Sequence, residues 1–143
     1  MFDLDSRLAD DCHFVTQWPV SQVLLMDDQR YPWLILVPTK SQVSEIFELS
    51  PSDQQGLWRE ISVLSAFMKT RFQAHKINVG ALGNVVSQLH IHVIARYAHD
   101  ATFPNPVWGV GQAQRYPRQE REALIDSLSA ELVSLDLTVP TPH

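Results

Sequence analysis

The stretch Gln88-Leu89-His90-Ile91-His92-Val93-Ile94-Ala95-Arg96 carries the strongest structural signal in the chain. Its aliphatic and β-branched residues predict a strand over residues 88–96. Side chains alternate across a strand, so Gln88, His90, His92 and Ile94 are expected on one face. Leu89, Ile91 and Val93 then face the other side, where they can pack against a helix.

Two histidines on one strand face are compatible with three kinds of site. They can bind a metal ion, because paired imidazoles are common zinc ligands. They can be solvated polar residues of an exposed sheet face. They can also act on a phosphate, since a neutral imidazole is a nucleophile and a second imidazole can donate a hydrogen bond. The spacing of the two histidines does not distinguish among these three kinds of site.

The flanking sequence predicts an α+β fold, an antiparallel sheet with one long helix and a C-terminal helix. The long helix follows Ser50, which can cap it, with Pro51 in its first turn and apolar residues every three to four positions. We expect strands at residues 20–26, 33–37 and 76–82, the first two as an antiparallel pair. We expect shorter helical segments from Leu4 to Cys12 and over residues 44–49, and the C-terminal helix at 120–135. We also expect a turn at Gly83-Asn84 and a loop over residues 98–117.

Composition narrows the function classes. The chain has 143 residues, which suits a single domain over residues 1–143 with a core at about residues 4–135. Its net charge of −5 argues against binding a nucleic-acid polymer, which usually requires a basic face. No apolar run is long enough for a membrane span. The single cysteine, Cys12, and the acidic start without a signal pattern predict a cytoplasmic protein.

The motif stretch resembles the signature of the histidine-triad (HIT) family, His-x-His-x-His followed by apolar residues. The resemblance covers roughly residues 4–135, with the predicted elements in the same order. It is closest to a bacterial subgroup that shares three further segments: Tyr-Pro-Trp-Leu-Ile-Leu-Val-Pro at 31–38, Leu-Gly-Asn-Val-Val at 82–86 and Pro-Val-Trp-Gly at 106–109. Together these matches make the resemblance highly specific.

The resemblance implies a role for individual residues. His90 matches the nucleophile that takes up the nucleotidyl group, and His92 matches the histidine that contacts the phosphate. Asp27, or Asp28 one position later, matches the ligand of the ribose hydroxyls. Asn78 and Asn84 match polar residues that line the nucleotide site. The resemblance further implies a nucleotide as small-molecule partner, no cofactor, no metal on the histidines, and a homodimer in which the sheets of two subunits join.

The chain departs from the family pattern at two positions. Gln88 replaces the first histidine of the triad; its amide can still donate and accept hydrogen bonds, but it cannot titrate. Val85 stands where many members have a serine or threonine. The resulting prediction is a hydrolase or transferase acting at the α-phosphate of a dinucleoside polyphosphate or a nucleoside phosphoramidate. The alternative is a nucleotide-binding or sensing protein with little turnover.

Overall fold

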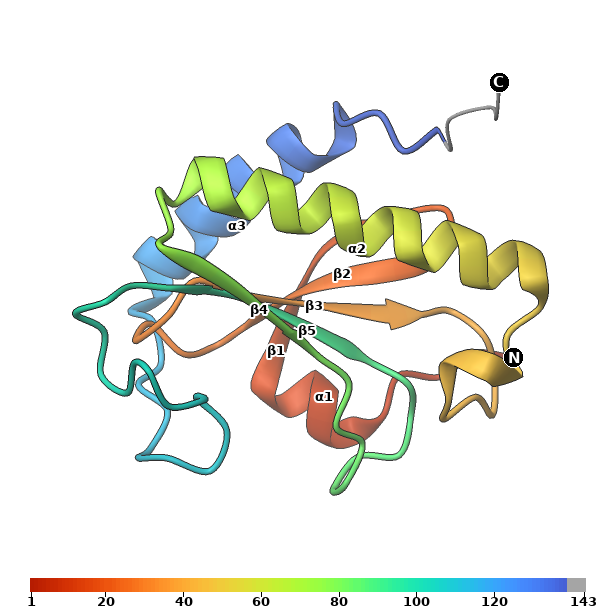
Figure 1. The fold of residues 1–143 in the computed structure, drawn as a ribbon, viewed down its shortest axis with the longest axis horizontal. Helices are drawn as coiled ribbons and strands as arrows, with labels where there is room; N and C mark the ends of the chain where they lie inside the picture. Colours follow the sequence, from red (N-terminus) through yellow and green to blue (C-terminus); the bar gives the residue numbers. More distant parts are fainter. Residues whose placement is uncertain (139–143) are drawn as a thin grey trace.

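The computed structural model describes residues 1–138, and it contains a five-stranded antiparallel sheet in the order β1-β2-β3-β5-β4 (Figure 1). The strands are β1 (Cys12–Gln17), β2 (Ser21–Met26), β3 (Trp33–Pro38), β4 (Lys76–Gly80) and β5 (Ile91–Arg96). The helices are α1 (Ser6–Asp11), the short 3₁₀ turn η1 (Ile46–Glu48), α2 (Pro51–Arg71) and α3 (Arg118–Val133). This arrangement confirms the predicted α+β class.

The paired strands and the long helix form as expected from their sequences. β2 and β3 pair antiparallel with Val23 opposite Leu36. The Ser50 hydroxyl accepts a hydrogen bond from the Asp53 amide at 3.1 Å and so caps α2, whose first residue is Pro51. The buried stripe of α2 lies against one face of the sheet, and α3 lies on the same side (Figure 1).

One strand was missed by the sequence patterns. Cys12 has helical spacing from Leu4 and Leu8, but α1 ends at Asp11 and Cys12 begins β1. β1 pairs with β2, and the register shifts between Phe14 and Thr16. Such a bulge interrupts the alternation of buried and exposed residues from which a strand is recognised.

The motif strand is shorter than predicted. β5 starts at Ile91, because the last pair with β3 is Leu36–Ile91 and the last pair with β4 is Gly80–His92. Gln88, Leu89 and His90 therefore precede the ladder, and the Leu89 amide instead donates to the Val43 carbonyl at 2.9 Å. His90 stands at the point where the chain enters the sheet.

The two faces of the sheet carry separate cores. The face under α2 and α3 holds Val23, Leu34, Leu36, Ile91 and Val93, together with the buried stripes of both helices. The opposite face holds Tyr31, Trp33, Ile35 and Ile94 with Leu8 of α1. His90 and His92 are both buried, and His92 lies on this second side against Trp33. Within residues 1–138, no helix is long and apolar enough to cross a membrane.

A buried ion pair anchors the end of β5. Arg96 and Asp100 have side chains that are 1% and 3% exposed, and their N–O distance is 2.9 Å. Burial by itself raises the pKa of Asp100, but hydrogen bonds from Arg96 and from the amides of Tyr97, Phe103 and Thr102 outweigh burial and hold the pKa far below its usual range. Asp100 thus organises the loop that follows β5.

Replacing Asp100 by Asn should lower the free energy of unfolding by about 3–5 kcal/mol, because it leaves the Arg96 charge buried without its partner. The lowered pKa means that the pair stabilises the fold fully above the unfolded-state value of about 3.9 and ceases to do so as the pH falls through the folded-state value. Urea titrations at pH 7 and pH 3 measure both effects. The exposed Asp126→Asn is the control, and equal stability of the two variants at pH 7 contradicts the assignment.

Candidate functional site

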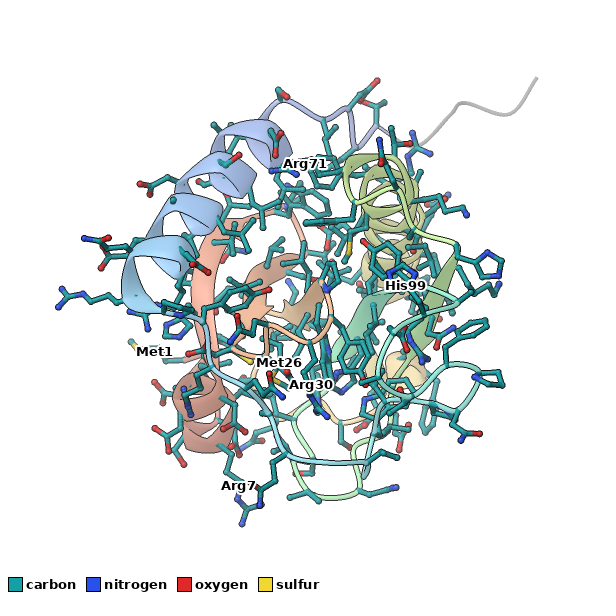
Figure 2. All side chains as sticks on the ribbon, turned by 90° about the vertical axis from the view of Figure 1, so that its left-hand side faces the viewer. Met1, Arg7, Met26, Arg30, Arg71 and His99 are labelled. Atoms are coloured by element: carbon teal, nitrogen blue, oxygen red, sulfur yellow. The ribbon has the colours of Figure 1, made fainter. Side chains whose placement is uncertain are left out.

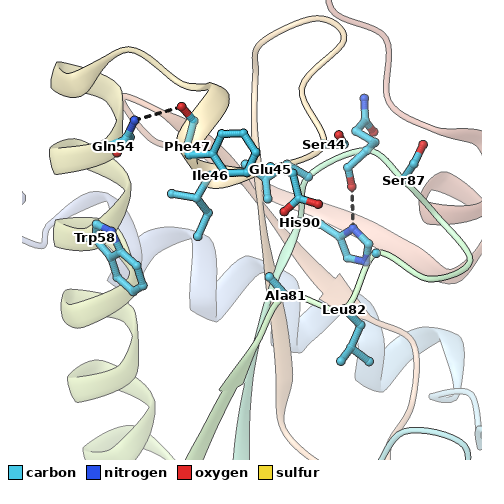
Figure 3. Close-up of a pocket in the computed structure, with 13 residues that line it drawn as sticks. Ser44, Glu45, Ile46, Phe47, Gln54, Trp58, Ala81, Leu82, Ser87 and His90 are labelled. Atoms are coloured by element: carbon cyan, nitrogen blue, oxygen red, sulfur yellow. Dashed lines mark hydrogen bonds between the residues drawn. The ribbon is translucent and has the colours of Figure 1, made fainter.

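His90 is held by the backbone of its own segment. Its Nδ1 lies 2.7 Å from the Gln88 carbonyl oxygen. A carbonyl can only accept a hydrogen bond, so Nδ1 carries the proton and donates it. The neutral ring then has its lone pair on Nε2, at the opposite edge (Figure 3). This is the protonation state that a nucleophilic imidazole requires.

His92 is held in the opposite tautomer by Trp33. The Trp33 indole Nε1 lies 3.0 Å from His92 Nδ1, and both groups are buried. An indole N–H only donates, so Nδ1 of His92 is the acceptor and Nε2 carries the proton. Burial, and then the nearby His90, lower the pKa of His92 to about 3. His92 is therefore a neutral hydrogen-bond donor at physiological pH.

The two imidazoles lie edge to face, with ring centroids 4.9 Å apart. Both line a cavity of about 500 Å³ whose walls come from α1, from residues 82–86 and from the loop at Trp108 and Gly109. His90 also lines a second cavity of about 560 Å³, formed by residues 44–47, by α2 and by residues 81–83 (Figure 3). A group bound at His90 thus has space on two sides of the ring.

The Gln88 side chain does not orient His90. Its Oε1 accepts a hydrogen bond from the Asp5 amide and its Nε2 donates to the Asp3 carbonyl, both at 2.8 Å. The side chain therefore ties down the segment that leads into α1. The backbone carbonyl of Gln88 orients His90, and a carbonyl is present whichever residue occupies the position.

Asp27 and Asp28 lie beside a third cavity of about 230 Å³, which shares Asp11, Met26, Trp108 and Gly109 with the histidine cavity. Burial by itself would raise the pKa of both carboxyl groups. At Asp27, hydrogen bonds from His13, the Tyr116 amide and Arg115 outweigh burial and lower the pKa. At Asp28, hydrogen bonds from the Arg30 side chain and from the amides of Arg30 and Gln114 do the same. Arg30 and Met26, which both line this cavity, are labelled near the centre of Figure 2. Both carboxylates are buried and fully engaged with their own chain.

The two predicted asparagines are placed differently. Asn84 lines the histidine cavity together with Val85, whose side chain is 76% exposed. Asn78 accepts a hydrogen bond from Arg96 at 2.8 Å, so its amide helps to satisfy the buried guanidinium. Of the predicted residues, the structure thus gathers His90, His92 and Asn84 around one cavity, and it places Asn78 and the side chain of Gln88 in other contacts.

Trp108, in the Pro-Val-Trp-Gly segment, packs against the core of the second sheet face and also lines the histidine cavity. Its ring centroid lies 5.4 Å from that of His92, and it packs closely over Gly80, where a Cβ atom would come within 2.9 Å of the indole. The Trp108-Gly109 pair can be recognised in the sequence of the proline-rich loop. Its position beside His92, however, depends on how that loop folds over the sheet.

A metal site at the histidine pair would need further protein ligands beside the two imidazoles. In the part of the chain from residue 1 to 138, no group of three or more histidine, cysteine, aspartate or glutamate side chains is placed to hold an ion. The Nδ1 atoms of His90 and His92 are already engaged by Gln88 and Trp33.

The antiparallel α+β fold thus places two imidazoles of opposite tautomer where the chain enters β5. The HIT domain family model matches residues 7–99, and the chain belongs to this family. A histidine triad protein from Marinobacter aquaeolei shares 43% identity with a TM-score of 0.91, covering 95% of this chain and 99% of that one. One from Sinorhizobium meliloti shares 45% identity with a TM-score of 0.87, covering 91% and 96%. Curated proteins gave no match.

Replacing Gln88 by Ala should free residues 3–5 without altering His90. We expect hydrogen exchange at the Asp5 amide to accelerate, because the side-chain acceptor is lost, while the His90 ring remains in the Nδ1–H form. Amide exchange and ¹⁵N spectra of histidine-labelled protein measure the two effects. A change in the His90 tautomer contradicts the assignment of its orientation to the backbone.

Proposed function

We propose that the chain is a nucleotide hydrolase or transferase that acts at the α-phosphate of a nucleotide conjugate. The observation that carries the proposal is the hydrogen bond from His90 Nδ1–H to the Gln88 carbonyl, which leaves the Nε2 lone pair available beside the cavity. Membership of the HIT family supports a nucleotide as the partner.

The proposed reaction has two steps. Nε2 of His90 forms a bond to the α-phosphorus, and the bond from phosphorus to the leaving group breaks, with its electron pair departing on the leaving group. Water or another acceptor then attacks phosphorus, the P–N bond breaks, the electron pair returns to Nε2, and the attacking group releases a proton to solvent. The Gln88 carbonyl stabilises the positive charge on the ring of the intermediate. This chemistry requires no cofactor.

His92 is proposed to donate its Nε2–H to a non-bridging oxygen of the phosphate, where negative charge grows in the transition state. Asn84 is proposed to bind the nucleotide from the facing wall. Asp27 and Asp28 remain candidate ribose ligands through the cavity that they share with Trp108, although each is already paired with arginine. Asn78 would act only indirectly, through Arg96.

The alternative function is nucleotide binding or sensing with little turnover. Val85 offers no hydroxyl to the cavity, and Gln88 has no titratable group, which are the two observations in its favour. Tight binding of dinucleoside polyphosphates and adenosine phosphoramidates without product would support sensing, and restored turnover in Gln88→His would strengthen that case.

We further propose a homodimer. β4 is an edge strand, and Phe47, Trp58 and Leu82 line a cavity beside it while being 77%, 55% and 46% exposed. Large exposed apolar side chains grouped in this way are typical of interaction surfaces. The one cysteine, Cys12, is free and buried, and we propose a cytoplasmic location on that basis.

His90→Asn should reduce turnover by about 10⁴-fold or more, because loss of a nucleophile removes the covalent route. His99→Asn, an exposed histidine outside the site, should retain activity. Initial rates with a panel of dinucleoside polyphosphates measure these effects, and full activity of His90→Asn refutes the mechanism.

Light scattering during size-exclusion chromatography should report twice the mass of the chain, which is 16.3 kDa. Trp58→Glu should shift the mass toward the monomer, since a charge cannot be buried in an apolar interface without a partner. Val133→Lys, a comparably exposed position on α3, is the control. A monomer in the wild-type protein refutes the dimer.

A further inference from the structure

The pairing of Trp33 with His92 restricts which leaving groups the site can expel. We propose that Trp33 is a positioning residue that keeps His92 a donor to phosphate oxygens and never an acid toward the leaving group, so that the site acts on conjugates whose leaving group departs as a stable oxygen anion. Phosphoric anhydrides and mixed carboxylic–phosphoric anhydrides meet this condition. The inference rests on the proposed attack by His90.

The first argument concerns the proton on His92. An imidazole is a good acid only as imidazolium, with protons on both nitrogens. Protonation of Nδ1 would set an N–H against the Trp33 N–H, 3.0 Å away, and would replace a buried hydrogen bond by a repulsion. Trp33 lies 5% exposed in the core of the second sheet face, so it cannot easily turn aside. Burial, which lowers the pKa of His92, acts in the same direction.

The second argument concerns the other positions from which a proton could come. The proton on His90 is directed at the Gln88 carbonyl, away from Nε2, and the Gln88 side chain is bonded to residues 3–5. Val85 presents no hydroxyl, and the serines that line the second cavity are Ser44, whose hydroxyl donates to Glu48 at 2.9 Å, and the exposed Ser87, whose neutral hydroxyl is a much weaker acid than an imidazolium. The described charged side chains that line the two cavities are Arg7, which holds its proton, and the exposed carboxylates Asp10, Asp11 and Glu45, which accept hydrogen bonds.

The chemical consequence follows from the balance of the first step. When the P–O bond of an anhydride breaks, the electron pair departs on a phosphate or carboxylate oxygen, and no proton is needed. When the P–N bond of an alkyl phosphoramidate breaks, the nitrogen must gain a proton to leave as an amine. A site without an acid therefore distinguishes the two classes. Since general acid catalysis contributes about 10²–10⁴-fold, the discrimination should be large.

The substrate test compares 4-nitrophenyl and phenyl esters of adenosine 5′-monophosphate with the N-hexyl phosphoramidate of the same nucleotide. We expect the nitrophenyl ester to show a kcat/KM at least about 100-fold above those of the other two, because hexylamine must gain the missing proton to leave and phenoxide, without an acid to protonate it, is a more basic and poorer leaving group than nitrophenoxide. Similar values for all three refute the inference and leave the proposed function intact. Absence of turnover and of any His90 adduct with all three refutes the proposed function, and the leaving-group preference with it.

The test of Trp33 uses ¹⁵N spectra of histidine-labelled protein and the variant Trp33→Phe. In the wild type, His92 should remain in the Nε2–H form from pH 5 to pH 8, a range chosen to bracket the ordinary titration of histidine. In Trp33→Phe, a mixture of the two tautomers should appear. The variant's kcat/KM with the nitrophenyl ester should fall, but by less than the about 100-fold that outright loss of an oxyanion donor costs.

Trp18→Phe is the matched control, because Trp18 is equally buried and its Nε1 also donates a hydrogen bond, to the Leu132 carbonyl at 3.3 Å. It should lower the melting temperature without changing the His92 spectrum. An effect on His92 from both variants would indicate a general loss of packing and refute a specific role of Trp33. A wild-type His92 that titrates within the range, or that carries its proton on Nδ1, refutes the restriction directly.

Discussion

The antiparallel pairing of β3 with β5 is the constraint on which the site depends. It sets Ile35 opposite His92 and Trp33 opposite Ile94, and it therefore brings the Trp33 indole alongside the His92 ring on one face. A shift of the register by one residue would turn the histidines toward α2 and the aliphatic residues toward the cavity. The apolar residues under α2 prevent this, because Ile91 and Val93 are buried in that core.

Because of this pairing, His90 and His92, which have the same side chain, are held as different tautomers. His90 lies just before the strand and donates Nδ1–H to a carbonyl, whereas His92 lies within it and accepts at Nδ1 from an indole. The Gln88 carbonyl can only accept a hydrogen bond and the Trp33 indole can only donate one, so each partner fixes the tautomer of the neutral ring beside it. Nε2 is then a lone pair on one ring and a donor on the other, which suits attack on a phosphorus whose oxygens must also be held.

The sequence predicted much of this arrangement for identifiable reasons. The cap at Ser50, the stripe of α2 and the β2–β3 pair follow local rules that burial then reinforces. β1 was missed because its bulge breaks the alternation, and Gln88 was wrongly placed within the strand because the end of a ladder depends on where its neighbours end. The Trp33 hydrogen bond and the approach of Trp108 join residues distant in sequence, and no local pattern reports such contacts.

The central claim is that His90 Nε2 is the nucleophile, and the most direct test is to observe the bond that it forms. Wild-type protein mixed with a dinucleoside polyphosphate, quenched in acid-free denaturant within milliseconds and digested, should yield one peptide heavier by a nucleoside monophosphate, with the added mass on His90. Release of product without any such peptide, or an adduct located on another residue, would contradict the account.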